Sequence, residues 1–181
     1  RHALNRLAAQ LDLLYETQTA DCLHDPWAAL EDYLALRLGA VAWSDFWADH
    51  ARRPARRAQA RRLSAFFEAQ YARQLMFTSC AFFFDDFDRI EPRNAIAWAA
   101  RAIECNKAAC GISLEAPFLR DLATVKSWQS SLAADEVYRA IAGQRRPVAE
   151  MALSHAALRV GVDGLAQIGL QPGRPRGRGK D

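Results

Sequence analysis

Three consecutive phenylalanines, Phe82, Phe83 and Phe84, place the strongest constraint on how this chain folds. In an α-helix successive side chains point about 100° apart, so these rings would sweep roughly 200° of the helix surface. A surface helix buries a stripe of only about 100°. Either one ring therefore enters a second interface or lines a pocket, or the segment is a helix end or loop. In the latter case the rings meet the neighbouring acids Asp85 and Asp86 at one rim.

The composition of the chain favours helices. Hydrophobic residues make up 51% of its 181 residues, enough for one domain with a real core. Alanine and leucine dominate and β-branched residues are scarce. The net charge of +3 is too small to favour nucleic acid as a partner, and no run approaches the roughly 18 apolar residues that span a bilayer. We expect an all-α bundle of about seven helices and no membrane partner.

Start and stop signals divide the chain into these helices. Leucines at helical spacing predict a first helix over residues 2–20. Asp25 before Pro26 is typical of a helix start, and Gly39 of a helix end. The further expected helices cover residues 44–50, 55 into the phenylalanine-rich stretch, 91–110, 117–125, 135–142 and 148–160.

The apolar spacing also predicts which faces are buried. For the helix that begins at Asp25, the expected core face is Trp27, Leu30, Tyr33, Leu34 and Leu38. For the long helix after Pro54, it is Leu63, Phe66, Phe67, Tyr71 and Leu75, with polar Glu68, Gln70 and Arg73 outside. Residues 1–160 should thus form a helical domain. Six glycines and four basic residues predict a flexible tail over residues 161–181.

The cysteines and histidines do not form a metal-binding or catalytic pattern. Cys22, Cys80, Cys105 and Cys110 include no CxxC pair, so reduced thiols in a cytoplasmic protein are the simplest interpretation. The four histidines show no HxxxH spacing. The sequence contains no phosphate-binding or dinucleotide-binding motif. We therefore expect no cofactor and no metal.

Two charged clusters each allow a functional and a structural interpretation. Six arginines between Arg52 and Arg62 could grip phosphates, but the cluster lacks interleaved aromatic residues, which favours a solvated face or an interdomain contact. Asp85, Asp86 and Asp88 could form one wall of an acid–base or cation site. A paired-carboxylate hydrolase needs two acids about 5–10 Å apart across a cleft, whereas neighbours on one helix diverge. The alternative is that these acids cap the next turn or pair with Arg73, Arg89 or Arg93.

The segment from Met76 to Asp86, continuing to Ile90-Glu91, resembles the hallmark of an uncharacterised helical region. That region lies C-terminal to the catalytic barrel in proteins similar to glycoside hydrolase family 57. Its other helices are resembled by Asp25-Pro26-Trp27-Ala28-Ala29, Phe118 to Leu122, Lys126-Ser127 and Val148 to His155, so the likeness covers about residues 1–160. Where the family has Gly-Trp this chain has Ala81-Phe82, which keeps a ring and loses the indole N–H donor.

This resemblance implies a function without catalysis in this chain. The catalytic acids belong to the barrel, so the chain alone is expected to be inactive. The helical region would pack on the barrel and line an α-glucan cleft with aromatic and acidic side chains. The expected substrate-binding residues are Cys80, Phe82, Phe83, Asp85 and Asp86. The alternative is a helical interaction module that binds a protein or nucleic acid through its arginine-rich helix.

Overall fold

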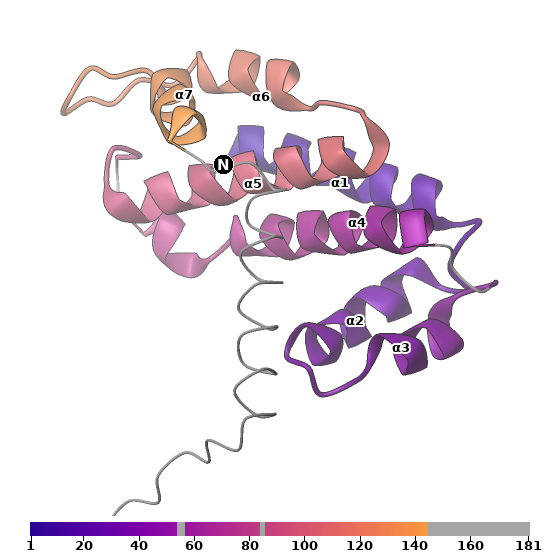
Figure 1. The fold of residues 1–181 in the computed structure, drawn as a ribbon. Helices are drawn as coiled ribbons and strands as arrows, with labels where there is room; N and C mark the ends of the chain where they lie inside the picture. Colours follow the sequence, from indigo (N-terminus) through magenta and orange to yellow (C-terminus); the bar gives the residue numbers. More distant parts are fainter. Residues whose placement is uncertain (54–56, 84–85, 145–181) are drawn as a thin grey trace, which may run out of the picture. The chain divides into compact units, whose positions relative to one another are not determined.

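The computed structural model describes residues 1–53, 57–83 and 86–144, which form seven α-helices and one short 3-10 helix. These residues contain no strand, only two isolated bridges, so the all-α prediction is confirmed for them. The helices, labelled in Figure 1, are α1 (His2–Thr19), α2 (Pro26–Arg37), α3 (Trp43–His50), α4 (Arg57–Leu75), η1 (Ser79–Phe82), α5 (Ile90–Cys110), α6 (Glu115–Leu122) and α7 (Ala134–Gly143).

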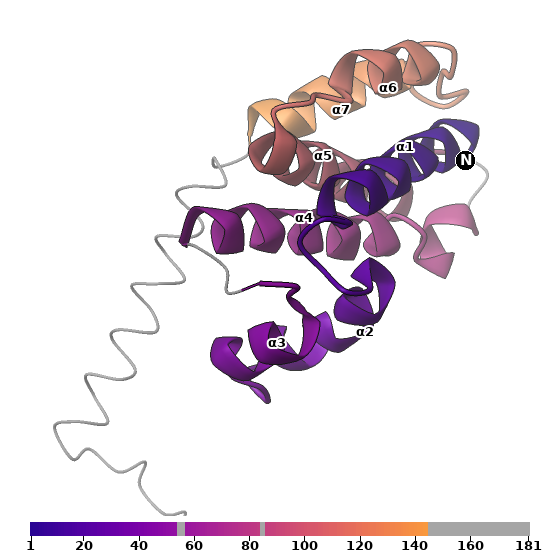
Figure 2. The same ribbon diagram turned by 90° about the vertical axis from the view of Figure 1, so that its right-hand side faces the viewer.

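The chain divides into two units, Arg1–Arg145 and Arg146–Asp181. The expected helix over residues 148–160 and the expected tail over residues 161–181 lie outside the described residues. Within the first unit, α4 and α5 run side by side (Figures 1 and 2). Helices α6 and α7 lie beyond α5, and α2 and α3 lie beyond α4.

One hydrophobic core joins α1 and α5 to the end of α4 and to α6 and α7. Helix α5 is rich in alanine, and its small buried side chains let neighbouring helices approach closely. Its predicted core face, which includes Ile96, Ala99 and Ile103, is confirmed. The partners that cover it include Leu4, Leu7, Leu11, Phe118 and Tyr138.

A second core, between α1, α2, α3 and α4, is largely aromatic. Phe67 lies at its centre. Its ring stacks on Tyr33 with centroids 4.9 Å apart, meets the ring of Phe46 edge-on at 5.6 Å, and lies 6.2 Å from the ring of Tyr15. Phe66 and Leu63 are buried beside it, as the spacing predicts. The aromatic side chains of α4 therefore hold α2 and α3 onto the bundle.

The predicted core face of α2 is confirmed only in part. Tyr33 is buried and Leu30 is half-buried as predicted, whereas Leu34 is 51% and Leu38 74% exposed and the unpredicted Ala29 and Leu36 are buried. Leucine and alanine surround almost the whole of this helix, so the spacing cannot distinguish the two sides. Tyr33 decides the orientation because its ring reaches Phe67 and its hydroxyl reaches Glu68.

The predicted exposure of Gln70 is also wrong, since its side chain is buried. Its amide nitrogen donates a hydrogen bond of 3.1 Å to the backbone carbonyl of Leu11 on α1. A buried polar group is tolerated where it finds such a partner. Tyr71 and Leu75, predicted to be core residues, are only half-buried.

The predicted helix start at Asp25 and the helix ends before Gly39 and Gly111 are confirmed, whereas the helix expected over residues 117–125 covers Glu115–Leu122. The Asp25 carboxylate accepts from the backbone amides of Trp27 at 2.9 Å and Ala28 at 3.1 Å. Gly39 and Gly111 have φ of 75° and 76°, the left-handed conformation that favours glycine after a helix.

Replacing Phe67 with alanine should cost about 3–5 kcal/mol of unfolding free energy, because it leaves a cavity among three aromatic side chains. The matched control, Leu13→Ala, removes an exposed side chain of α1 and should change the free energy by less than about 0.5 kcal/mol. Urea denaturation followed by circular dichroism measures both. Equal midpoints for the two variants would contradict the central position of Phe67.

Candidate functional site

The phenylalanine-rich segment is a connection rather than a long helix. Helix α4 ends at Leu75, the short η1 covers Ser79–Phe82, and α5 begins at Ile90. Of the two arrangements that the sequence allows, the structure has the helix end and loop. Residues 84 and 85 lie outside the described residues, so the predicted role of Asp85 stays a prediction.

Asp86 is the hub of this connection. Its carboxylate is 4% exposed and accepts four hydrogen bonds. One oxygen accepts from the backbone amide of Asp88 at 3.0 Å. The other accepts from the Ser127 hydroxyl at 2.8 Å and from the backbone amides of Trp128 and Gln129 at 3.1 and 3.2 Å. Asp86 therefore fastens the loop between α6 and α7 to the connection between α4 and α5.

Ser127 continues this network into the loop. It is buried, and its oxygen accepts from the amides of Gln129 at 3.2 Å and Ser130 at 3.0 Å. Its own amide donates to the carbonyl of Leu132 at 2.8 Å. The positive φ of Ser131, 59°, closes the turn. The loop conformation thus depends on two polar side chains, one of them from the other connection.

The electrostatics of the hub favour the ionised carboxylate. Burial raises the pKa of Asp86, but the hydrogen bonds from Asp88, Ser127, Gln129 and Trp128 outweigh it and hold the pKa below its ordinary value of 3.8. One carboxylate oxygen accepts three of these hydrogen bonds and the other accepts one. Asp86 is therefore a structural anchor at neutral pH and is not free to exchange protons with a substrate.

Phe82 is half-buried and engaged within the chain. Its ring stacks on Phe77 with centroids 6.2 Å apart and an interplanar angle of 21°. The guanidinium of Arg1 lies 5.0 Å from the centroid of Phe82, and that of Arg73 lies 5.8 Å from the centroid of Phe77. Two cations and two rings therefore form one stack at the end of α4.

Phe83, three residues before Asp86 in the chain, and Trp128, whose backbone amide donates to Asp86, are both exposed aromatic residues. Phe83 is 83% and Trp128 71% exposed, and we call this pair the aromatic rim. Cys80 is exposed as a free thiol on η1, close to Phe83 in sequence. The sequence analysis missed Trp128. The one available signal was Ser127 beside it, which belongs to the Lys126-Ser127 match, while an isolated tryptophan in a polar loop has no periodicity to mark it.

The other charged groups of the predicted clusters are mostly used within the bundle. Asp88 pairs with Arg93 at 2.6 Å, one of the local ion pairs considered above, and Arg73 pairs with Asp12 at 2.5 Å. In the arginine-rich segment, Arg52 donates to the carbonyls of Ala20, Leu23 and His24. Arg62 donates to the Gln18 backbone and side chain at 3.0 and 2.8 Å.

Arg53 and Arg61 are exposed, whereas Arg56 and the side chain of Arg57 lie outside the described residues. Among the described residues no group of three His, Cys, Asp or Glu side chains could hold a metal ion. None of the four cysteines, which all lie in the described part of the chain, forms a disulfide bond. No helix in the described part of the chain has the length and apolar character needed to cross a bilayer.

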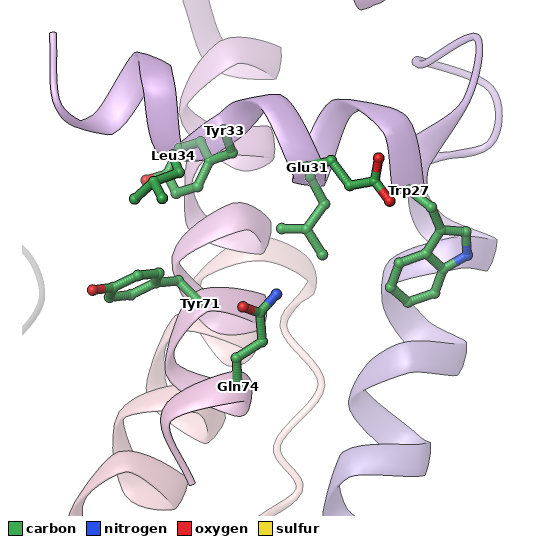
Figure 3. A pocket seen from close by; sticks show the side chains of 7 residues that line it. Trp27, Glu31, Tyr33, Leu34, Tyr71 and Gln74 are labelled. Carbon is green, nitrogen blue, oxygen red and sulfur yellow. The ribbon is translucent and has the colours of Figure 1, made fainter. Parts of the chain in front are cut away.

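A pocket of about 420 Å³ lies between α2 and α4 (Figure 3). Its walls come from the α2 face that the spacing assigns to the core and from the outer side of α4. The sequence analysis therefore missed it. The lining residues are Trp27, Leu30, Glu31, Tyr33, Leu34, Tyr71 and Gln74.

Comparisons with known proteins identify a family and no characterised relative. A family model described as a domain of unknown function (DUF3536) matches residues 1–165. No curated protein and no solved structure matches the chain.

Replacing Asp86 with asparagine should lower the melting temperature at pH 7, because the new amide group faces donors where the carboxylate accepts. Since the folded pKa of Asp86 is depressed, its stabilisation is present above the ordinary pKa and is lost as pH falls through the folded value. The gap between wild type and variant should therefore narrow below about pH 4. Thermal melts from pH 2 to 7 measure this difference in melting temperature, and replacement of the exposed Asp49 with asparagine is the control. A difference that does not change with pH would contradict an ionised Asp86.

Proposed function

Since this chain belongs to the family of the domain of unknown function DUF3536, we propose a function for it as the non-catalytic helical domain of a carbohydrate-active enzyme. The domain packs on a catalytic barrel similar to that of glycoside hydrolase family 57. There it lines an α-glucan cleft with aromatic side chains. The sequence resemblance of the segment from Met76 to Asp86 supports this choice of enzyme.

The observation that carries the proposal is the aromatic rim. Phe83 and Trp128 keep most of their surface in water, although rings of this size are usually covered. The backbone amide of Trp128 donates a hydrogen bond to Asp86, and Phe83 lies three residues before Asp86 in the chain. Sugar rings present C–H faces that pack on aromatic side chains.

The carboxylates beside the rim suit binding rather than bond cleavage. Hydrolysis of a glycosidic bond needs two carboxyl groups across a cleft. Asp86 is buried and accepts four hydrogen bonds, and Asp88 pairs with Arg93. Both orient the loops that hold the rim. This division agrees with catalytic acids that belong to a barrel and not to this chain.

The expected site residues divide accordingly in this proposal. Phe83 contacts sugar in place of Phe82, whose ring is stacked within the chain. Asp86 orders the rim, and the exposed thiol of Cys80 lies on the approach to it. Exposed apolar side chains elsewhere on the bundle, such as Leu38 and Ile90, offer surface for the barrel to cover.

Phe83→Ala and Trp128→Ala should each weaken glycogen binding by about five- to thirtyfold, since a lost ring contact is worth about 1–2 kcal/mol. Affinity electrophoresis in gels that contain glycogen measures the dissociation constant. Trp43→Ala, which removes a partly exposed ring from α3, is the matched control and should bind as wild type does. Unchanged retardation of both rim variants, with normal circular dichroism, would overturn the proposal.

A further inference from the structure

The pocket between α2 and α4 combines apolar walls from both helices. Trp27, Leu30 and Leu34 follow one side of α2 at spacings of three and four residues, and Tyr71 and Gln74 lie one turn apart on α4. Its volume of about 420 Å³ falls within the roughly 300–1,000 Å³ of small-molecule sites. Both Trp27 and Leu34 stay exposed in the folded domain, so apolar surface is available to a ligand.

Two polar side chains of the pocket have no partner among the described residues. The Glu31 carboxylate and the Gln74 side-chain amide are both exposed, and neither forms a hydrogen bond or ion pair with a described residue. Figure 3 shows the Gln74 amide reaching from α4 into the space between Tyr71 and Trp27. Glu31 only accepts hydrogen bonds, whereas Gln74 both donates and accepts. Together they can form hydrogen bonds with hydroxyl groups, which both donate and accept.

The neighbouring charges narrow the class of ligand. Glu68, on α4, accepts hydrogen bonds from the hydroxyl of the lining residue Tyr33 at 2.5 Å and from Arg37 at 3.1 Å. The Arg37 guanidinium lies 4.2 Å from the centroid of Tyr71, so a ligand cation at this ring would meet a positive charge. An anion would meet Glu31. A purely apolar ligand would strip water from Glu31 and Gln74 without replacing their hydrogen bonds.

We propose that this pocket is a second sugar site, which takes a pyranose ring of a neutral oligosaccharide. The C–H face of the ring packs on Trp27, and its hydroxyls bond to Glu31 and Gln74. The site lies on α2 and α4, apart from the aromatic rim on the connections beside α5 and α7. The choice of α-glucan as the oligosaccharide rests on the proposed function, whereas the preference for a neutral hydroxylated ring rests on the pocket.

The test is affinity electrophoresis of the 181-residue chain in gels with glycogen, repeated with free maltoheptaose as competitor. Two variants probe the pocket: Glu31→Ala combined with Gln74→Ala, and Trp27→Leu. The polar variant removes groups that hold nothing else in the described structure, so it should fold normally. Each should weaken binding by at least about fivefold. The matched control is Glu16→Ala, which removes an exposed glutamate of α1.

The outcomes separate this site from the aromatic rim. Weaker binding in the pocket variants, with normal circular dichroism, supports the inference even if the rim variants bind normally. Unchanged binding in both pocket variants overturns the inference and leaves the proposed function in place where the rim variants lose affinity. A wild-type chain that neither glycogen nor maltoheptaose engages overturns both. If the chain binds a lysine-rich peptide through Glu31 and binds no sugar, the proposal of a neutral ligand for the pocket is overturned.

Discussion

The hydrogen bonds to the Asp86 carboxylate are the interaction on which the arrangement of the candidate site depends. This buried side chain accepts hydrogen bonds from the connection between α4 and α5, to which it belongs, and from the loop between α6 and α7, 41 to 43 residues further along the chain. Unlike a hydrophobic contact, this set of donors specifies direction, because each amide must point at an oxygen. It therefore determines where the two connections meet, and with them the places of Phe83 and Trp128. The same bonds remove Asp86 from chemistry and make its carboxylate a part of the framework.

The aromatic rim and the α2–α4 pocket differ in the side chains that they offer to a ligand. The rim presents two exposed aromatic side chains, and the backbone of one of them, Trp128, is held by a hydrogen bond to the buried Asp86. The pocket combines ring surface with two polar side chains that no described residue engages. Sugars offer both an apolar face and a belt of hydroxyls, so the two places fit the same class of ligand. Both lie on helices or beside their ends, where packing from the two cores holds the backbone.

The helix starts and ends could be predicted because they depend on neighbours in the sequence. Asp25 caps the helix that follows it, and Gly39 and Gly111 adopt the backbone that their residue type allows. The core face of α5 was also predictable, since its apolar residues repeat with the helical period against polar ones. Helix α2 lacks this contrast between apolar and polar positions, so its buried side could not be predicted. Gln70 was predicted to be exposed because its partner, the backbone carbonyl of Leu11, lies on a different helix.

The sequence by itself determined the all-α class of the described residues and the presence of something unusual in the phenylalanine triplet. A triplet cannot lie in one helical seam, whatever surrounds it. Only the tertiary structure decided how far each ring is exposed. Phe82 is half-buried and stacks on Phe77, whereas Phe83 is 83% and Trp128 71% exposed, and the backbone of Trp128 reaches Asp86 from a distant loop. The reason is that exposure and hydrogen bonding are properties of contacts between distant segments, which local spacing does not encode.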